Sequence, residues 1–367
     1  MSTVIPPVAA PTALVEADSA TFPVHVRAYV ELARTVREHG LLRRARGFYL
    51  LLGIIQCLAL AGIVTGFVLL GDSWFQLLMA GALGILLTQV AFVAHEAAHR
   101  QVLKSRVGNT LLARLIGNGV VGISYSWWNG KHTRHHSNPN QVGKDPDIAS
   151  GVVAFVPADA ARTKGPIRAI VRRQGWLLFP LLTLEGLNLH WQGLRHVLSG
   201  RGVERRWSEI ALLAARFALI LIPVFLLLPL GMAFAFLGVE LAVFGVYMGA
   251  VFAPNHKGMT VFARDANVDF FSRQVRSSRN IRGGWWMTTL MGGLNYQIEH
   301  HLFPGMARPY LVRTRPLVRE HCRRLDVPYT EVGLFRSYAI VVAHLNKVGL
   351  AARDPWECPL MADRLRG

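Results

Sequence analysis

Four stretches of the chain are apolar for long enough to cross a lipid bilayer. The first two are separated only by the short link at residues 71–73, which predicts a hairpin. The last two form one tract from Ile210 to Ala253, which is too long for one span and is interrupted near its middle by Pro229-Leu230-Gly231. We therefore expect spans at about 49–70, 74–94, 210–229 and 232–253. The pattern predicts an all-α integral membrane protein whose four transmembrane helices form two hairpins.

Polar and basic residues dominate the two long remaining regions, 95–209 and 254–367. Cytoplasmic loops carry an excess of Lys and Arg. Both regions are rich in these residues, whereas the links at 71–73 and 229–231 contain none. We therefore expect a cytoplasmic helical cap on a membrane domain of residues 47–310. A cytoplasmic C-terminal region, 311–367, is expected to follow it.

The first 46 residues follow neither pattern. Residues 1–22 are rich in Pro, Ala and small polar residues, which predicts a disordered leader. Residues 24–46 carry six arginines among apolar residues. That pattern is typical of a basic amphipathic helix lying on the membrane surface, and it is equally compatible with an ordinary solvated helix.

Composition supports a membrane protein and limits its partners. Hydrophobic residues make up 52% of the chain and charged residues only 17%, yet the formal net charge is +18. We expect lipid headgroups, an anionic substrate or an acidic redox partner as counter-charges. No nucleic-acid partner is expected, because no basic stretch is interleaved with stacking aromatic residues. Inside the spans, Arg216 is expected to snorkel to the interface, and Glu240 is expected to be neutral and hydrogen-bonded between helices.

Eight of the fourteen histidines lie in clusters near the ends of the predicted spans. The clusters are HEAAH with His95 and His99, HTRHH with His132, His135 and His136, APNHKG with His256, and QIEHH with His300 and His301. Residues three or four apart share one face of a helix, and neutral imidazole binds iron, copper or zinc. The six scattered histidines are expected to be structural; they are His25, His39, His190, His196, His321 and His344.

The predicted topology places all eight clustered histidines on one side of the membrane. The chain crosses twice between His95 and His256, and no span separates either of them from the neighbouring clusters. Eight imidazoles exceed what one ion accepts, so we expect two metal ions with open positions. The three cysteines form no CxxC pair, which argues against a cysteine-ligated centre.

These clusters and their flanks resemble the membrane fatty acid desaturase family. The order HxxxH, HxxHH, QxxHH is similar to the family's three histidine boxes. Residues 127–148, WWNGKHTRHHSNPNQVGKDPDI, resemble its second-box region. Residues 292–304, GGLNYQIEHHLFP, resemble the third box of its front-end subgroup. The resemblance covers about residues 50–310.

The resemblance implies a ligand set and a reaction. Seven of the clustered histidines match the family's iron ligands, and His256 matches an additional histidine beyond the last span. The family uses two irons, O2 and two electrons to remove two hydrogens from an unactivated CH2–CH2 pair. The implied substrate is a long acyl chain, carried as acyl-CoA or as an acyl lipid. An alkyl C–H bond has no acidic proton, so redox chemistry at a metal is needed.

Polar residues beside the boxes are candidates for orienting the metal ligands. Gln297 is the strongest, because a histidine occupies its position in related boxes. Asn255 and Asn295 are further candidates, and an ordinary surface or capping role fits each of these residues as well. The same alternatives apply to Glu96, Asp145, Asp147 and Glu299. Four tryptophans are expected near the interface, as anchors or as part of a substrate tunnel; they are Trp127, Trp128, Trp285 and Trp286.

The electron supply and the exact reaction stay open at this point. Many front-end desaturases carry a fused cytochrome b5 domain with an HPGG motif, and this sequence has no such motif. We therefore expect electrons from a separate ferredoxin, cytochrome b5 or reductase. A lipid or carotenoid hydroxylase, ketolase or acetylenase fits the same boxes. A non-enzymatic haem or metal carrier is the remaining alternative, although the predicted spans contain no histidine.

Overall fold

The computed structural model describes residues 24–352, and it is mainly helical. Four of its helices are long and apolar enough to cross a membrane, as predicted; they are α2 (Arg46–Leu70), α3 (Gln76–Ala98), α10 (Arg206–Leu227) and α11 (Leu230–His256). Both α3 and α11 continue beyond the predicted apolar spans. His95 and His256 therefore belong to the same rigid helices that form two of the spans.

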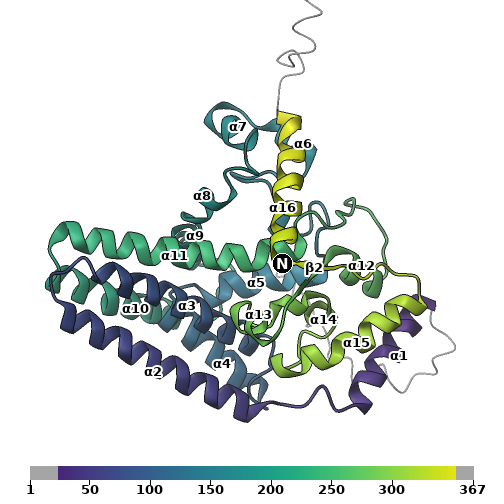
Figure 1. Cartoon of the computed structure of the whole chain (residues 1–367), viewed down its shortest axis with the longest axis horizontal. Coiled ribbons are helices and arrows are strands. Elements are labelled where there is room, and N and C mark those ends of the chain that lie inside the picture. Colours follow the sequence, from purple (N-terminus) through teal and green to yellow (C-terminus); the bar gives the residue numbers. More distant parts are fainter. Residues whose placement is uncertain (1–23, 353–367) are drawn as a thin grey trace, which may run out of the picture.

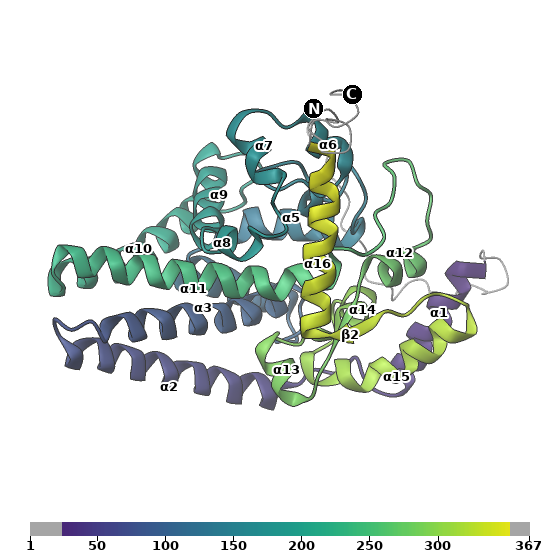
Figure 2. The same ribbon diagram turned by 45° about the horizontal axis from the view of Figure 1, so that its top comes forward.

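The four long helices lie side by side, and the links α2–α3 and α10–α11 are at the same end of the molecule (Figures 1 and 2). Helices α3 and α11 form the centre of this group. A Cβ atom at Gly84 of α3 would lie 2.7 Å from the carbonyl oxygen of Glu240 in α11, so only glycine allows this close approach. The apolar stretch of α2 buries none of its residues against the protein, as expected for a helix that faces lipid.

Shorter elements form a layer around the other end of the long helices (Figure 2). Before α10 these are α1 (Val24–Glu38), α4 (Arg106–Ile116), η3 (Gly117–Val121), α5 (Tyr125–Ser137), η4 (Pro146–Ile148), α6 (Pro157–Arg162), α7 (Gly165–Val171), α8 (Leu178–Leu182) and α9 (Glu185–Ser199). After α11 they are α12 (Phe270–Ser277), β1 (Asn280–Arg282), α13 (Trp285–Leu290), η5 (Leu294–Tyr296), α14 (Gln297–Leu302), α15 (Arg308–Arg324), β2 (Glu331–Gly333), α16 (Leu334–Gly349) and η6 (Leu350–Ala352).

The strands β1 and β2 correct the all-α expectation. They pair in parallel, with Asn280 opposite Glu331 and Arg282 opposite Gly333. Each strand has only three residues, which is too short for a two-residue hydrophobic period to stand out in the sequence. The pairing joins the segment before the third histidine box to the start of α16.

The basic N-terminal segment forms a helix, α1, but it ends at Glu38 instead of continuing to residue 46. Its apolar side, including Leu32 and Val36, is buried in a cluster with Phe271 of α12 and Val318 of α15. This side therefore packs on protein and cannot face lipid. The predicted leader at residues 1–22 lies outside the described residues.

Arg216 and Glu240 contact each other, which the sequence did not predict. The Arg216 side chain is buried where α10 meets η3 and α11. There its Nη2 lies 3.8 Å from Oε1 of Glu240, and its Nε donates to the carbonyl of Val120. Glu240 thus has a cationic partner, and its Oε1 accepts no hydrogen bond from the described residues.

Candidate metal centre

All eight clustered histidines converge on one site. Helix α3 supplies His95 near its end, with His99 directly after it. Helix α5 supplies three histidines, α11 supplies His256 as its last residue, and α14 supplies two. Helix α5 is capped at its N-terminus by Ser124, whose hydroxyl accepts a hydrogen bond from the amide of Trp127. All six residues of α14 are buried, so the third box lies inside the protein.

The histidines form two groups, a division that the sequence alone did not reveal. The ligand nitrogens of the first group all lie within 4.8 Å of one another; its members are His95, His99, His132, His136 and His300. The Nε2 atom of His132 is 3.0 Å from that of His95 and 2.8 Å from that of His99. Trp128 stacks on the His132 ring with a centroid distance of 4.5 Å.

The second group contains His135, His256 and His301, again with ligand nitrogens within 4.8 Å. The Nε2 atoms of His135 and His256 are 3.3 Å apart. The two groups are neighbours, because the rings of His136 and His301 stack at 4.2 Å. The arrangement thus provides two adjacent clusters of imidazole nitrogens.

The chemistry of these nitrogens fits bound cations. Both ring nitrogens of His136 and the Nε2 atoms of His300 and His301 are buried without a hydrogen-bond partner among the described residues. Burial lowers the pKa of His99 to about 3 and holds the pKa of His136, His300 and His301 well below the usual value. These four imidazoles are therefore neutral, and converging neutral lone pairs are the donor set that iron, copper or zinc accepts.

Residues around the second group fix its ring orientations. Asp145 accepts from Nδ1 of His135 at 3.0 Å, and its side chain is fully buried. Burial alone would lower the pKa of His135, but the carboxylates of Asp147 and Asp145 outweigh burial and raise this pKa. Gln274 of α12 accepts from Nδ1 of His301 at 2.9 Å. Each contact directs the opposite ring nitrogen, Nε2, toward the centre of the group.

Of the three amide side chains predicted to orient ligands, only Gln297 bonds to a histidine within residues 24–352, and Asn255 bonds to Gln297 in turn. Nε2 of Gln297 lies 2.9 Å from Nε2 of His256, and its Oε1 accepts from Nδ2 of Asn255 at 3.1 Å. Asn295 instead donates to Oγ1 of Thr288 at 3.3 Å, and no hydrogen bond within residues 24–352 joins it to a histidine. Gln297 therefore lies directly against a histidine of the second group.

The two glutamates beside the boxes bind other partners. Glu96 forms a buried two-point ion pair with Arg308 of α15, at 2.7 and 2.8 Å. Glu299 accepts hydrogen bonds from Asn280 at 2.7 Å and Tyr329 at 2.8 Å. Sequence reasoning missed Arg308 and Gln274, because neither lies in a histidine box and only the fold brings them to the site.

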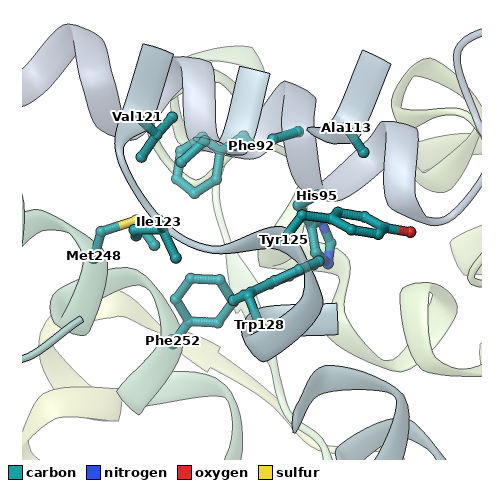
Figure 3. Close-up of a pocket in the computed structure, with 12 residues that line it drawn as sticks. Phe92, His95, Ala113, Val121, Ile123, Tyr125, Trp128, Met248 and Phe252 are labelled. Carbon is teal, nitrogen blue, oxygen red and sulfur yellow. The ribbon is translucent and has the colours of Figure 1, made fainter. Parts of the chain in front are cut away.

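An apolar cavity opens beside the first group (Figure 3). Its lining comprises Ala91, Phe92, Ala94, His95, Ala113, Gly117, Val121, Ile123, Tyr125, Trp128, Met248 and Phe252. Figure 3 shows Met248 and Val121 on the side away from His95. Of the four predicted tryptophans only Trp128 lines this cavity, whereas Trp285 and Trp286 are exposed. The cavity therefore presents an apolar surface directly beside His95.

Comparison with known proteins assigns the family. A model of the fatty acid desaturase family matches residues 72–333, which include both histidine groups. The Delta(8)-fatty-acid desaturase of Helianthus annuus is 28% identical over 89% of this chain and 74% of its own length. The Delta(6)-fatty-acid desaturase fat-3 of Caenorhabditis elegans is 26% identical over 88% of this chain and 75% of its own length. This chain is therefore an oxidoreductase that belongs to the fatty acid desaturase family.

Proposed function

We propose that this protein is an oxygen-dependent, di-iron fatty acyl desaturase that introduces a carbon–carbon double bond into a long acyl chain. The observation that supports this most directly is the apolar cavity that adjoins a group of five neutral histidines, with a second group of three beside it. Two hydrogens from adjacent CH2 groups, with two electrons and two protons from outside, reduce one O2 to two waters. The substrate is an acyl-CoA or an acyl lipid.

The two histidine groups suggest how two irons would be held. His95, His99, His132, His136 and His300 would hold one, and His135, His256 and His301 would hold the other, with the amide of Gln297 beside them. When bound, iron supplies the O2-dependent oxidising chemistry that an unactivated C–H bond requires. The chain's own contribution is to orient the imidazoles, to keep those of the first group neutral, and to exclude water from the apolar cavity that positions the substrate.

The same proposal includes the cellular setting. Lys and Arg are dense in the regions that form the layer around the site, whereas the links α2–α3 and α10–α11 at the opposite end contain none. This asymmetry supports a multi-pass protein in the lipid bilayer with the site on the cytoplasmic face. Electrons would come from a separate ferredoxin, cytochrome b5 or reductase, and no nucleic acid takes part.

The proposal is tested by metal and product analysis. We expect about two irons per purified chain, and a new double bond in the lipids of cells that express it. His135→Ala or His301→Ala should abolish the product while the protein still inserts in the membrane, because each removes a ring from the second group. His39→Ala, which changes an exposed histidine far along the sequence from the boxes, is the matched control. A hydroxyl or keto product without a double bond would contradict the proposal, as would haem absorbance.

A further inference from the structure

A shallow groove lies on the outer side of α15, away from the apolar cavity. It is lined by Pro316, Arg319, Glu320, Arg323, Val327 and Tyr329. In Figures 1 and 2, α15 extends away from the four long helices and packs beside α1, at the end of the molecule opposite the links α2–α3 and α10–α11. The positive-inside rule concerns residues close in sequence to the ends of spans, and α15 begins well beyond the end of α11.

The groove has a basic side. Arg315, Arg319 and Arg323 are four residues apart along α15 and therefore share one face of the helix. Arg315 pairs with Glu331 and Arg323 pairs with Glu320. Arg319 is exposed, and no carboxylate within residues 24–352 pairs with it.

Helix α1 extends the same charge. Arg27, Arg34 and Arg37 are exposed on α1, which packs against α15, and an ion pair between Arg324 and Glu31 joins the two helices. Exposed arginines outnumber exposed carboxylates across this pair of helices. An acidic protein surface is the complement of this charge.

A hydrogen-bonded connection runs from the groove to the third histidine box. The ring of Tyr329 lines the groove, and its hydroxyl donates to Oε1 of Glu299 at 2.8 Å. Asn280 donates to Oε2 of Glu299 at 2.7 Å and to the Tyr329 hydroxyl at 2.6 Å, which fixes both side chains. Glu299 is fully buried and directly precedes His300 and His301. One hydrogen bond and a short length of backbone thus separate the groove from both histidine groups.

We propose that this groove is the docking site of an acidic one-electron carrier protein, and that Tyr329 and Glu299 link the docked carrier to the metal centre. The inference rests on the proposed function, which requires two electrons from outside. Each docking event oxidises the carrier by one electron and reduces the metal centre by one. Two events therefore supply one double bond.

Docking is tested with Arg319→Glu and the control Arg201→Glu, an exposed arginine after α9. Iron-loaded protein in neutral detergent is mixed with reduced soluble cytochrome b5 or reduced plant-type ferredoxin, and oxidation of the carrier is followed optically. We expect Arg319→Glu to lower the second-order rate about tenfold at low salt for at least one carrier. High salt should remove the difference, and the control should match wild type. Turnover driven by dithionite, which needs no docking, should be unchanged in both variants.

The connection is tested with Tyr329→Phe, which keeps the ring and removes the hydroxyl. We expect a severalfold lower electron-transfer rate at saturating carrier, with unchanged carrier affinity, iron content and dithionite-driven turnover. Tyr338→Phe is the matched control, because this hydroxyl donates to the carbonyl of Ala250 in α11, away from the groove. An unchanged rate in Tyr329→Phe would overturn the connection.

Other results would overturn the docking site itself. One is that Arg319→Glu and wild type oxidise the carrier at the same rate. Another is that Arg319→Glu loses as much turnover with dithionite as with the carrier. A third is that neither carrier reduces wild-type protein that dithionite does reduce. A loss seen only in nanodiscs of anionic lipid, and absent in neutral detergent, would assign the arginines to lipid headgroups. In contrast, a wild-type protein that makes no double bond even with dithionite would contradict the proposed function and not the groove.

Discussion

Single residues around the histidines determine how the imidazole rings are oriented. Asp145 is the clearest case, because its buried carboxylate accepts from Nδ1 of His135 and from the backbone amides of Asn140 and Asp147. It therefore fixes both the tautomer of His135 and the loop after α5. We expect Asp145→Asn to weaken iron binding at the second group by about 10- to 100-fold, measured by titrating Fe(II) into metal-free protein. Asp265→Asn, in an exposed loop, should bind Fe(II) as tightly as wild type does. Equal Fe(II) affinity in the Asp145 and Asp265 variants would contradict the role of Asp145.

At the scale of elements, the helix that carries the second box is held by a carboxylate from one of the long helices. Glu209 of α10 is fully buried and accepts from the hydroxyl of Ser124 at 2.8 Å and of Ser126 at 2.5 Å, where α5 begins. We expect Glu209→Ala to lower the thermal midpoint and the iron content together, because a hydrogen bond to a buried charge contributes about 1.5–3 kcal/mol. Asp72→Ala, which removes an exposed carboxylate in the link between α2 and α3, should change both little.

A double variant separates this specific contact from general damage to the helix. If Glu209 acts through the start of α5, Ser126→Ala should cost little stability once Glu209 has been replaced. Full additivity of the two losses would show that the contact does not couple the elements. Iron content is the second measurement, since a loss of stability confined to α10 would leave it unchanged.

The limits of sequence reasoning are also clearest for elements. Long uniform hydropathy predicted the four long helices, and three- and four-residue spacing predicted the histidine faces. Three features could not be predicted, because each joins segments that are distant in sequence. They are the packing of α1, the pairing of β1 with β2, and the contact between Arg216 and Glu240. The division of the histidines into groups of five and three follows from how α3, α5, α11 and α14 meet. The spacing of the histidines along the sequence does not predict it.

For the whole molecule, the candidate metal centre lies where otherwise separate parts of the chain meet. Its histidines come from two long apolar helices and from two helices of the surrounding layer, so bound metal would tie these parts together. A ligand that binds only the folded state stabilises it, by about 2.7 kcal/mol at a hundredfold excess over its dissociation constant. We therefore expect chelation to lower the thermal midpoint by several degrees and added Fe(II) to restore it.

Two histidine variants test whether the effect of Fe(II) on the thermal midpoint comes from this site. His136→Ala removes a ring whose two nitrogens have no other partner in the described residues, so it should reduce the stabilisation by Fe(II) without removing a hydrogen bond. His39→Ala changes an exposed ring after α1 and should leave the Fe(II) effect intact. Calorimetry or a thermal fluorescence assay in detergent measures both. If chelation leaves the midpoint unchanged, the eight histidines do not join the long helices to the surrounding layer through metal, and packing such as that of α4 against α3 and of α9 against α11 connects these parts instead.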